Sequence, residues 1–297
     1  MWGGSDRAIF LVNLAALMIS SSGILGKLIT LPSPVTSFYR CILAAVFILL
    51  IVRLVRKPFS WRLKRGRRSF ILSGLFLALH WATYFYSLQL SNVSIAIISL
   101  FTYPIITTLI EPFFGRASVS GVNVVNSVLV IIGVFILVPE FDFNNQYTYG
   151  ILVGILSATF YALRNIFSKK LVQRRTSEEV MVIQLTVAAI VLSPSLFYYS
   201  YDLDLKTWGL LVVLGLITTA IGHTLFVSAL KYLTASTASI LASLQPVYAI
   251  ILAVIIIGEA VGINVVLGGI LILSAVLIQS LYPMVKKRRD YEVLDKQ

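Results

Sequence analysis

Two histidines, His80 and His223, lie inside long apolar stretches, where an imidazole must either do chemistry or find a hydrogen-bond partner. Because imidazole titrates near neutral pH, the pair could form a polar gate or respond to protons beside a cavity. Alternatively, each ring makes a structural hydrogen bond between helices. Two histidines in separate stretches, with no Cys or acidic residue nearby in sequence, form a poor metal site. We therefore expect neither a metal nor another cofactor.

Two arginines also lie within apolar stretches, and a guanidinium cannot shed its proton. Arg164 could recognise a substrate carboxylate, or its long side chain could extend to the nearby cytoplasmic face. Arg40 lies nearer the outer end of its stretch, where a structural pairing with helix ends or loop carbonyls is the favoured expectation. Glu111, within reach of Arg116, could close a gate, couple protons or face an exposed interface. Glu259 is expected to contact a helix end or a loop.

Polar and aromatic side chains recur at steps of three or four residues in several apolar stretches, so each set shares one helix face. Polar groups in a bilayer turn toward other helices or water. Single Ser and Thr at this spacing also let helices pack closely, whereas aromatic and amide groups near mid-membrane are better candidates for lining a cavity. The candidate substrate-binding set is His80, Trp81, Tyr84, Ser99, Tyr103, Tyr161, Arg164, Asn165, His223, Ser243 and Gln245.

Pro104 and Pro246 interrupt two apolar stretches at matching positions. Proline removes an amide donor and frees a carbonyl one turn earlier, which kinks a helix. The kinks could be static, but the favoured expectation is that the two prolines are hinges at which these helices bend.

Helices that span a membrane must position these residues. The chain has 297 residues, of which 58% are hydrophobic and 12% charged, whereas soluble domains are about 25% charged. Its apolar runs reach roughly 20 residues, enough to cross a bilayer as helices. We expect an all-α polytopic membrane protein with ten transmembrane helices, at 8–28, 35–54, 70–90, 95–114, 121–138, 149–170, 179–200, 207–230, 235–257 and 262–284.

Lysine and arginine determine the expected orientation. With the N-terminus in the cytoplasm, 20 of the 24 basic residues fall in cytoplasmic loops or the tail, and the outer loops hold mainly Asp and Glu. Both termini are therefore expected to be cytoplasmic. The net charge of +12 is then a topology signal near lipid headgroups, and no nucleic-acid partner is expected.

The ten stretches form two similar sets of five. Segment 87–96 aligns with 229–238 at an offset of 142 positions, and the same offset pairs Lys27 with Lys169. Because five is odd, the second set enters the membrane the other way up, which makes an inverted repeat. The expected units are 1–142, 143–285 and a basic cytoplasmic tail at 286–297.

The chain resembles the EamA-like branch of the drug/metabolite transporter superfamily. The resemblance rests on Phe38-Tyr39-Arg40, the segments 229–238 and 244–248, and Gly258-Glu259; in the first half, Arg116 stands where a Glu would be usual. It implies a bacterial inner-membrane carrier with a central cavity among helices 1, 3, 4, 6, 8 and 9, and with helices 5 and 10 as outer supports.

The expected function is a secondary transporter that moves small metabolites by alternating access. Amino acids or related compounds suit the neutral, aromatic candidate lining, and the resemblance implies export. The partners are then the small-molecule substrate and membrane lipid, and the chain is expected to act as a monomer. The alternatives are an intramembrane enzyme and a non-transporting membrane receptor or assembly subunit. Common enzyme motifs such as Gly-x-Ser-x-Gly and His-Glu-x-x-His are absent from the sequence, so no enzyme activity is expected.

Overall fold

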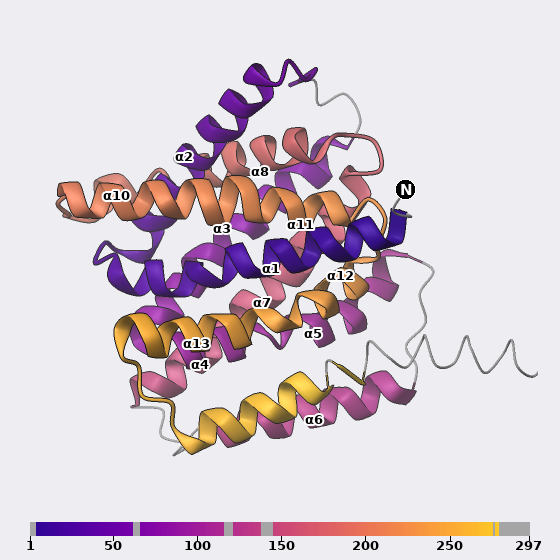
Figure 1. Ribbon diagram of the computed structural model, residues 1–297, viewed down its shortest axis with the longest axis vertical. Helices are drawn as coiled ribbons and strands as arrows, with labels where there is room; N and C mark the ends of the chain where they lie inside the picture. The colour runs from indigo at the N-terminus through magenta and orange to yellow at the C-terminus, as the bar shows by residue number, and fades with distance from the viewer. Residues whose placement is uncertain (1–3, 62–65, 116–120, 138–144, 276, 279–297) are drawn as a thin grey trace, which may run out of the picture.

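The computed structural model describes residues 4–61, 66–115, 121–137, 145–275 and 277–278, and every regular element in these ranges is helical (Figure 1). The helices before the midpoint of the chain are α1 (Gly4–Leu28), α2 (Ser33–Leu54), α3 (Arg67–Leu90), α4 (Val93–Leu100), α5 (Tyr103–Ile110), a 3₁₀ turn (Glu111–Phe114) and α6 (Gly121–Leu137). Those after it are α7 (Gln146–Leu171), α8 (Ser177–Leu192), α9 (Ser195–Tyr198), α10 (Leu205–Val213), a π-helical segment (Leu214–His223), α11 (Thr224–Ala229), α12 (Ala235–Leu241), a 3₁₀ turn (Ala242–Leu244), α13 (Gln245–Ile257) and a last helix at Ile263–Ala275.

Seven helical stretches of the described chain are long and apolar enough to cross a membrane. They coincide with the first four and the sixth to eighth of the expected spans. The remaining three expected spans correspond to shorter helices: α6, the interrupted pair α12 and α13, and the helix Ile263–Ala275. The all-helical membrane fold is thus confirmed for the described residues, and the last expected span is described only in part.

Local sequence explains where the helices begin. Asn92 caps α4 by accepting the backbone N–H of Ile95 at 2.8 Å. Thr176 and Glu179 form a reciprocal capping box at the start of α8. In each case a side chain satisfies a backbone group that the first helical turn leaves unpaired.

Both expected interruptions are present. The helix that begins at Val93 stops at Leu100 and restarts at Tyr103, one residue before Pro104. Its counterpart passes through the 3₁₀ turn Ala242–Leu244 and restarts at Gln245, again one residue before proline. Proline lacks the N–H that a continuous helix needs and disfavours helical backbone at the residue before it.

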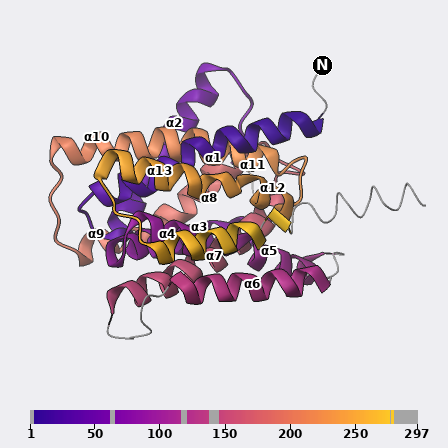
Figure 2. The ribbon, with the colours of Figure 1, turned by 60° about the horizontal axis from the view of Figure 1, so that its bottom comes forward.

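The helices form a bundle in which segments from both halves of the chain interleave. Figures 1 and 2 show α1 alongside α13 and α11, with α3 and α7 in the interior. In both views α6 lies beside the last helix at one side of the bundle. These two helices approach closely, because a Cβ added at Gly133 would lie 2.7 Å from Ile272.

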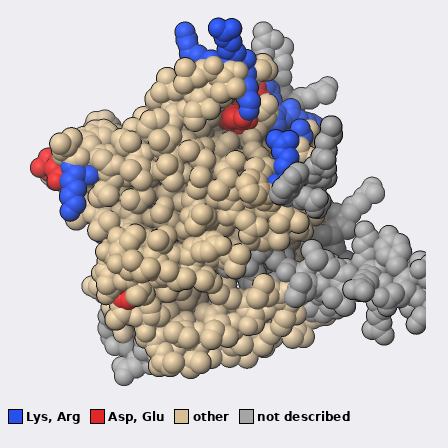
Figure 3. All heavy atoms as spheres, viewed as in Figure 1, with Lys and Arg blue, Asp and Glu red and all other residues tan. Residues whose placement is uncertain are grey.

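The outer surface is apolar between two charged ends. Exposed large hydrophobic side chains occur along most of the helices, including Phe10, Leu50, Phe135 and Ile255. In Figure 3 a broad area without charge lies between the Lys and Arg over the end of α2 and the few charged side chains at the opposite end. Such a belt matches the hydrocarbon layer of a bilayer, where lipid covers apolar side chains.

Candidate functional site

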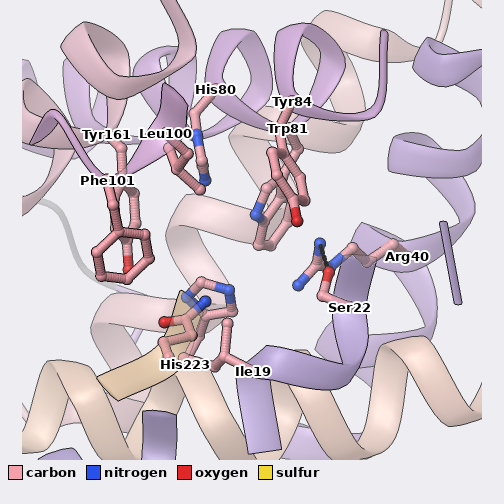
Figure 4. Close-up of a pocket in the computed structure, with 11 residues that line it drawn as sticks. Ile19, Ser22, Arg40, His80, Trp81, Tyr84, Leu100, Phe101, Tyr161 and His223 are labelled. Atoms are coloured by element: carbon pink, nitrogen blue, oxygen red, sulfur yellow. Dashed lines mark hydrogen bonds between the residues drawn. The ribbon is translucent and has the colours of Figure 1, made fainter. Parts of the chain in front are cut away.

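A cavity of about 20 Å³ lies at the centre of the bundle (Figure 4). A volume of this size holds about one water molecule, so a metabolite could enter only after the surrounding helices move apart. The lining comes from α1, α2, α3, the two interrupted helices, α7 and the π-helical segment. The lining residues are Ile19, Ser22, Arg40, His80, Trp81, Tyr84, Leu100, Phe101, Tyr161, His223 and Gln245.

Six of the predicted cavity residues lie together in this lining: His80, Trp81, Tyr84, Tyr161, His223 and Gln245. Ser99, Tyr103, Arg164 and Asn165 are buried but are not part of it. The side chain of Ser243 lies outside the described residues. The binding role of these residues stays a prediction, but the structure places most of the aromatic candidates at one cavity.

The two helix interruptions help to build the lining. Phe101 lies in the break before Pro104, and Gln245 lies at the restart before Pro246. The irregular backbone is tolerated at this depth because it is surrounded by protein and not exposed to lipid. Tyr103, just behind the first break, packs edge-on against Tyr161 with 4.7 Å between ring centroids and donates its hydroxyl to the Ser239 carbonyl at 3.3 Å.

His80 makes a reciprocal pair of hydrogen bonds with Ser157 of α7. The Ser157 hydroxyl donates to the His80 carbonyl at 2.9 Å, and His80 Nδ1 lies 2.8 Å from the same hydroxyl oxygen. Since that hydroxyl proton is already used, Nδ1–H is the donor in the second bond, and Nε2 keeps its lone pair. The His80 ring also stacks on Tyr161 with 4.4 Å between centroids. The interhelical bond that the sequence left as one alternative is therefore present at this histidine.

His223 differs, because its Nδ1 is buried with no hydrogen-bond partner among the described residues. Its ring lies 5.4 Å from Trp81 and 6.2 Å from Tyr161, measured between centroids. The indole Nε1 of Trp81 is likewise buried without a partner. Two unpaired polar atoms thus occur on side chains of the same cavity, where buried polar groups normally find partners.

Arg40 supplies the cation of the lining, and its partners differ from the helix ends or loop carbonyls that were expected. The residue is 1% exposed, and its guanidinium donates to hydroxyls of the described chain. Nε donates to Thr219 at 2.6 Å, Nη2 to Thr218 at 3.0 Å and Nη1 to Ser22 at 3.1 Å. Its Cζ lies 4.1 Å from the centroid of the Trp81 ring. Helix α2 therefore reaches the cavity through this one side chain.

The π-helical segment explains why Arg40 lies there. Thr218 and Thr219 are consecutive, yet both hydroxyls reach the same guanidinium and both also donate to the Leu214 carbonyl, at 2.7 and 3.1 Å. Gly215 permits the close approach, since a Cβ there would lie 2.8 Å from Leu43 on α2. The sequence features that could have indicated this partner for Arg40 are the two consecutive threonines and the nearby glycine, which lie within an otherwise apolar stretch.

Arg164 lies in a different environment from the one expected. It is fully buried and directed at α8, where Nε donates to Gln184 at 3.2 Å and Nη2 contacts the Met181 sulfur at 2.9 Å. Nη1 donates to Asn165 at 3.1 Å. It neither extends to the surface nor lines the central cavity, because its side chain lies in the interface between α7 and α8.

Matching lysine–glutamate clamps hold the two ends of the bundle. Lys27 donates to the carbonyls of Leu88 and Ser91 at the end of α3, at 2.8 and 2.7 Å. Glu259 accepts the backbone N–H groups of Val93 and Ser94 at the start of α4, at 2.9 and 2.8 Å. The contact that Glu259 makes is therefore with a helix end, as expected, and the α3–α4 turn is held from both sides.

The second clamp holds the turn between α11 and α12 in the same way. Lys169 donates to the carbonyls of Leu230 and Leu233 at 2.9 and 2.7 Å, the positions that lie 142 residues after the partners of Lys27. Glu111 accepts from the Ser236 hydroxyl and, at 3.4 Å, from its N–H. Glu111 thus fills the capping role of Glu259 in the other half; Arg116, its expected partner, lies outside the described residues.

The comparisons with known proteins agree with this architecture. The model of the EamA-like transporter family matches residues 6–138 and again residues 148–281. The chain belongs to the EamA-like transporter family. The two matches bear out the resemblance seen in the sequence, and they show that this EamA-like transporter has a two-repeat architecture.

Individual relatives of this EamA-like protein are distant. An uncharacterized transporter, YxxF, of Bacillus subtilis strain 168 is 25% identical over 280 residues, which cover 92% of this chain and 89% of the relative. The pseudopaline exporter CntI of Pseudomonas aeruginosa is 25% identical over 190 residues, which cover 64% of this chain and 66% of CntI. A solved protein structure superposes with a TM-score of 0.71 at 17% identity, covering 93% of this chain and 96% of that one, which supports the fold alone.

Proposed function

We propose that this integral membrane protein is a secondary transporter that exports small metabolites, amino acids or related compounds, across the bacterial inner membrane. The observation that carries the proposal is the central cavity, which gathers aromatic rings, two histidines and one cation from both repeats. Polar groups at such depth mark substrate pathways in membrane proteins. The exporter relative supports the direction of transport.

Alternating access is the proposed mechanism, with the two clamps as its closures. Each clamp ties a helix–helix turn of one repeat to elements of both repeats, and the two clamps lie at opposite ends of the bundle (Figure 1). With both formed, the cavity stays closed to each side. Release of the clamp at Lys27 opens the outer side, and release of the clamp at Lys169 opens the cytoplasmic side, so the cavity faces one side at a time.

The proposed organisation comprises ten spans in two inverted repeats, 1–142 and 143–285, followed by the basic tail 286–297. The positive-inside rule supports cytoplasmic termini. The expected hinges at Pro104 and Pro246 stay predictions, now supported by the interrupted helices at both places.

Counterflow into proteoliposomes tests the function. Vesicles that hold the purified full chain are loaded with an excess of one unlabelled L-amino acid and diluted into the same amino acid in labelled form. A carrier concentrates the label transiently, and the uptake saturates with external substrate. Uptake no greater than in protein-free vesicles across the twenty amino acids and their dipeptides would contradict the proposal.

A further inference from the structure

The charge of Arg40 is not neutralised by the protein in the described part of the chain. Of the five N–H donors of a guanidinium, three are used, and all three acceptors are neutral hydroxyls. The ion pairs of the described residues, Lys57–Glu178 and Arg175–Glu179, do not involve it. A buried charge without a counterion is costly. Arg164 likewise has only neutral acceptors among the described residues, but Arg40 is the arginine that lines the cavity, where an anionic solute can supply the counterion.

Unpaired polar atoms occur beside this cation. Trp81 Nε1, which can only donate a hydrogen bond, is buried and has no partner among the described residues. The Trp81 ring packs against the guanidinium. In the same described part of the chain, His223 Nδ1 is also buried without a hydrogen-bond partner. Figure 4 shows the guanidinium, the indole and the His223 ring around the same space. The lining therefore offers one positive charge and a neighbouring N–H to whatever enters.

We propose that Arg40 binds the carboxylate of the transported metabolite and that Trp81 Nε1 donates a second hydrogen bond to it. This inference rests on the proposed function and specifies its substrate class: solutes with one carboxylate and a neutral or aromatic remainder. The planar fork of a guanidinium matches the two oxygens of a carboxylate. The described lining has a single cation, which does not balance a polyanion.

The rest of the cavity suits the remainder of such a solute. Tyr161 and Phe101 present ring faces and edges beyond the cation, and Gln245 offers an amide. Arg164 is also buried, but it is excluded from this role because it does not line the cavity. Gln184, Asn165 and Met181 hold its guanidinium at the α7–α8 interface. Arg164 provides a matched control: an equally buried arginine that does not face the solute.

The test compares each amino acid with its carboxamide in the counterflow assay with the full chain. The carboxamide keeps the side chain and the amine but lacks the anionic group. For the wild type we expect kcat/KM to favour the acid by about tenfold or more, the size of one charge-assisted hydrogen bond. Arg40→Gln should bring the ratio of acid to amide to about one. Trp81→Phe, which removes only the N–H, should lower it about two- to tenfold.

Arg164→Gln should leave the ratio of acid to amide unchanged even if it lowers the yield of folded protein. If Arg40→Gln does not fold, the wild-type ratio and the Trp81→Phe variant each still test the site. If the wild type transports amides as fast as acids, the proposed transport function stands and the carboxylate site is overturned. An unchanged ratio of acid to amide in Arg40→Gln would have the same meaning. Absence of counterflow with every acid and amide would overturn the proposed function and, with it, this inference.

Discussion

Lys27 and Lys169 are chemically identical residues at matching places in the two repeats, and each donates to two carbonyls at the end of a helix. The last carbonyls of a helix lack intrahelical partners and carry partial negative charge, so an ammonium there is favourable. Both clamps are formed in the structure. A change at one of them should therefore favour opening at that end alone.

We predict that Lys27→Met increases access to the cavity from the outside and that Lys169→Met increases it from the cytoplasm. Loss of such a contact costs the closed state about 1 kcal/mol, or about a fivefold shift in population. The measurement is the labelling rate of a cysteine placed at the lining position Leu100, in a Cys41→Ala background, with an impermeant maleimide on one side at a time. Faster labelling from the same side in both variants would contradict the assignment of the clamps to opposite gates.

Gly154 shows how a single side-chain atom limits helix packing. A Cβ at this position would lie 2.6 Å from the Cβ of Ser99 and 3.2 Å from the hydroxyl of Ser87. Small residues at such contacts let helices in membranes approach closely.

We predict that Gly154→Leu destabilises the protein by about 1–3 kcal/mol, because the larger side chain forces α7 away from α3 and α4. The melting temperature of the detergent-solubilised protein measures the effect. Gly209→Leu is the control, since a Cβ there would meet no atom within 4 Å. Equal losses in the two variants would show that close packing at Gly154 is not the cause.

At the scale of elements, the two proline breaks turn the ends of helix segments toward the cavity. Each break either only shapes the lining or also bends during transport. These two alternatives lead to different expected results for Pro246→Ala. If the hinge bends, the alanine variant should fold normally but turn over more slowly, because a continuous helix is stiffer.

The measurement is counterflow rate per folded molecule, with protein quantified by size-exclusion chromatography. Pro34→Ala is the control, because Pro34 lies in the first turn of α2 and interrupts no helix. A lower yield of Pro246→Ala with unchanged turnover per folded molecule would make the kink purely structural.

The π-helical segment is the element that brings Thr218 and Thr219 to Arg40. Its stability should depend on that contact, since a buried guanidinium left without an acceptor pays its full desolvation cost. We predict that Thr219→Val lowers the free energy of unfolding by about 1–3 kcal/mol. Thr224→Val, whose hydroxyl has no partner in the described chain, should be near neutral. The melting temperatures of the two variants give the comparison, and similar losses in both would contradict the predicted role of Thr219.

At the scale of the whole molecule, charge placement decides orientation. The adjoining ends of α2 and α3 carry Arg53, Arg56, Lys57, Arg67 and Arg68, all exposed, and we expect these ends to face the cytoplasm. Cationic loops are retained in the cytoplasm during insertion. The apolar belt between the ends is then in contact with lipid.

We predict that both termini face the cytoplasm. Fusions of alkaline phosphatase and green fluorescent protein to either end should give fluorescence and no phosphatase activity, because each reporter is active on one side of the membrane only. Termini on opposite faces would contradict ten spans and the inverted repeat together.

The sequence by itself determined the membrane class, the repeat and the helix breaks. These depend on local composition and on spacing along the chain: apolar runs long enough to span a bilayer, the offset that pairs Lys27 with Lys169, and prolines that cannot continue a helix. Periodicity also indicated several lining residues, because side chains three or four positions apart share a helix face.

Only the tertiary structure decided which arginine lies at the cavity. Periodicity states which residues share a face but not which neighbour that face meets, and the answer depends on how each helix is rotated about its axis. For Arg40 the deciding contacts are Ser22, 18 positions earlier in the chain, and the two threonines of the π-helical segment, 178 and 179 positions later. For Arg164 they are Gln184 and Met181 on the next helix. No spacing rule encodes such long-range contacts, because packing selects them among many compatible pairings.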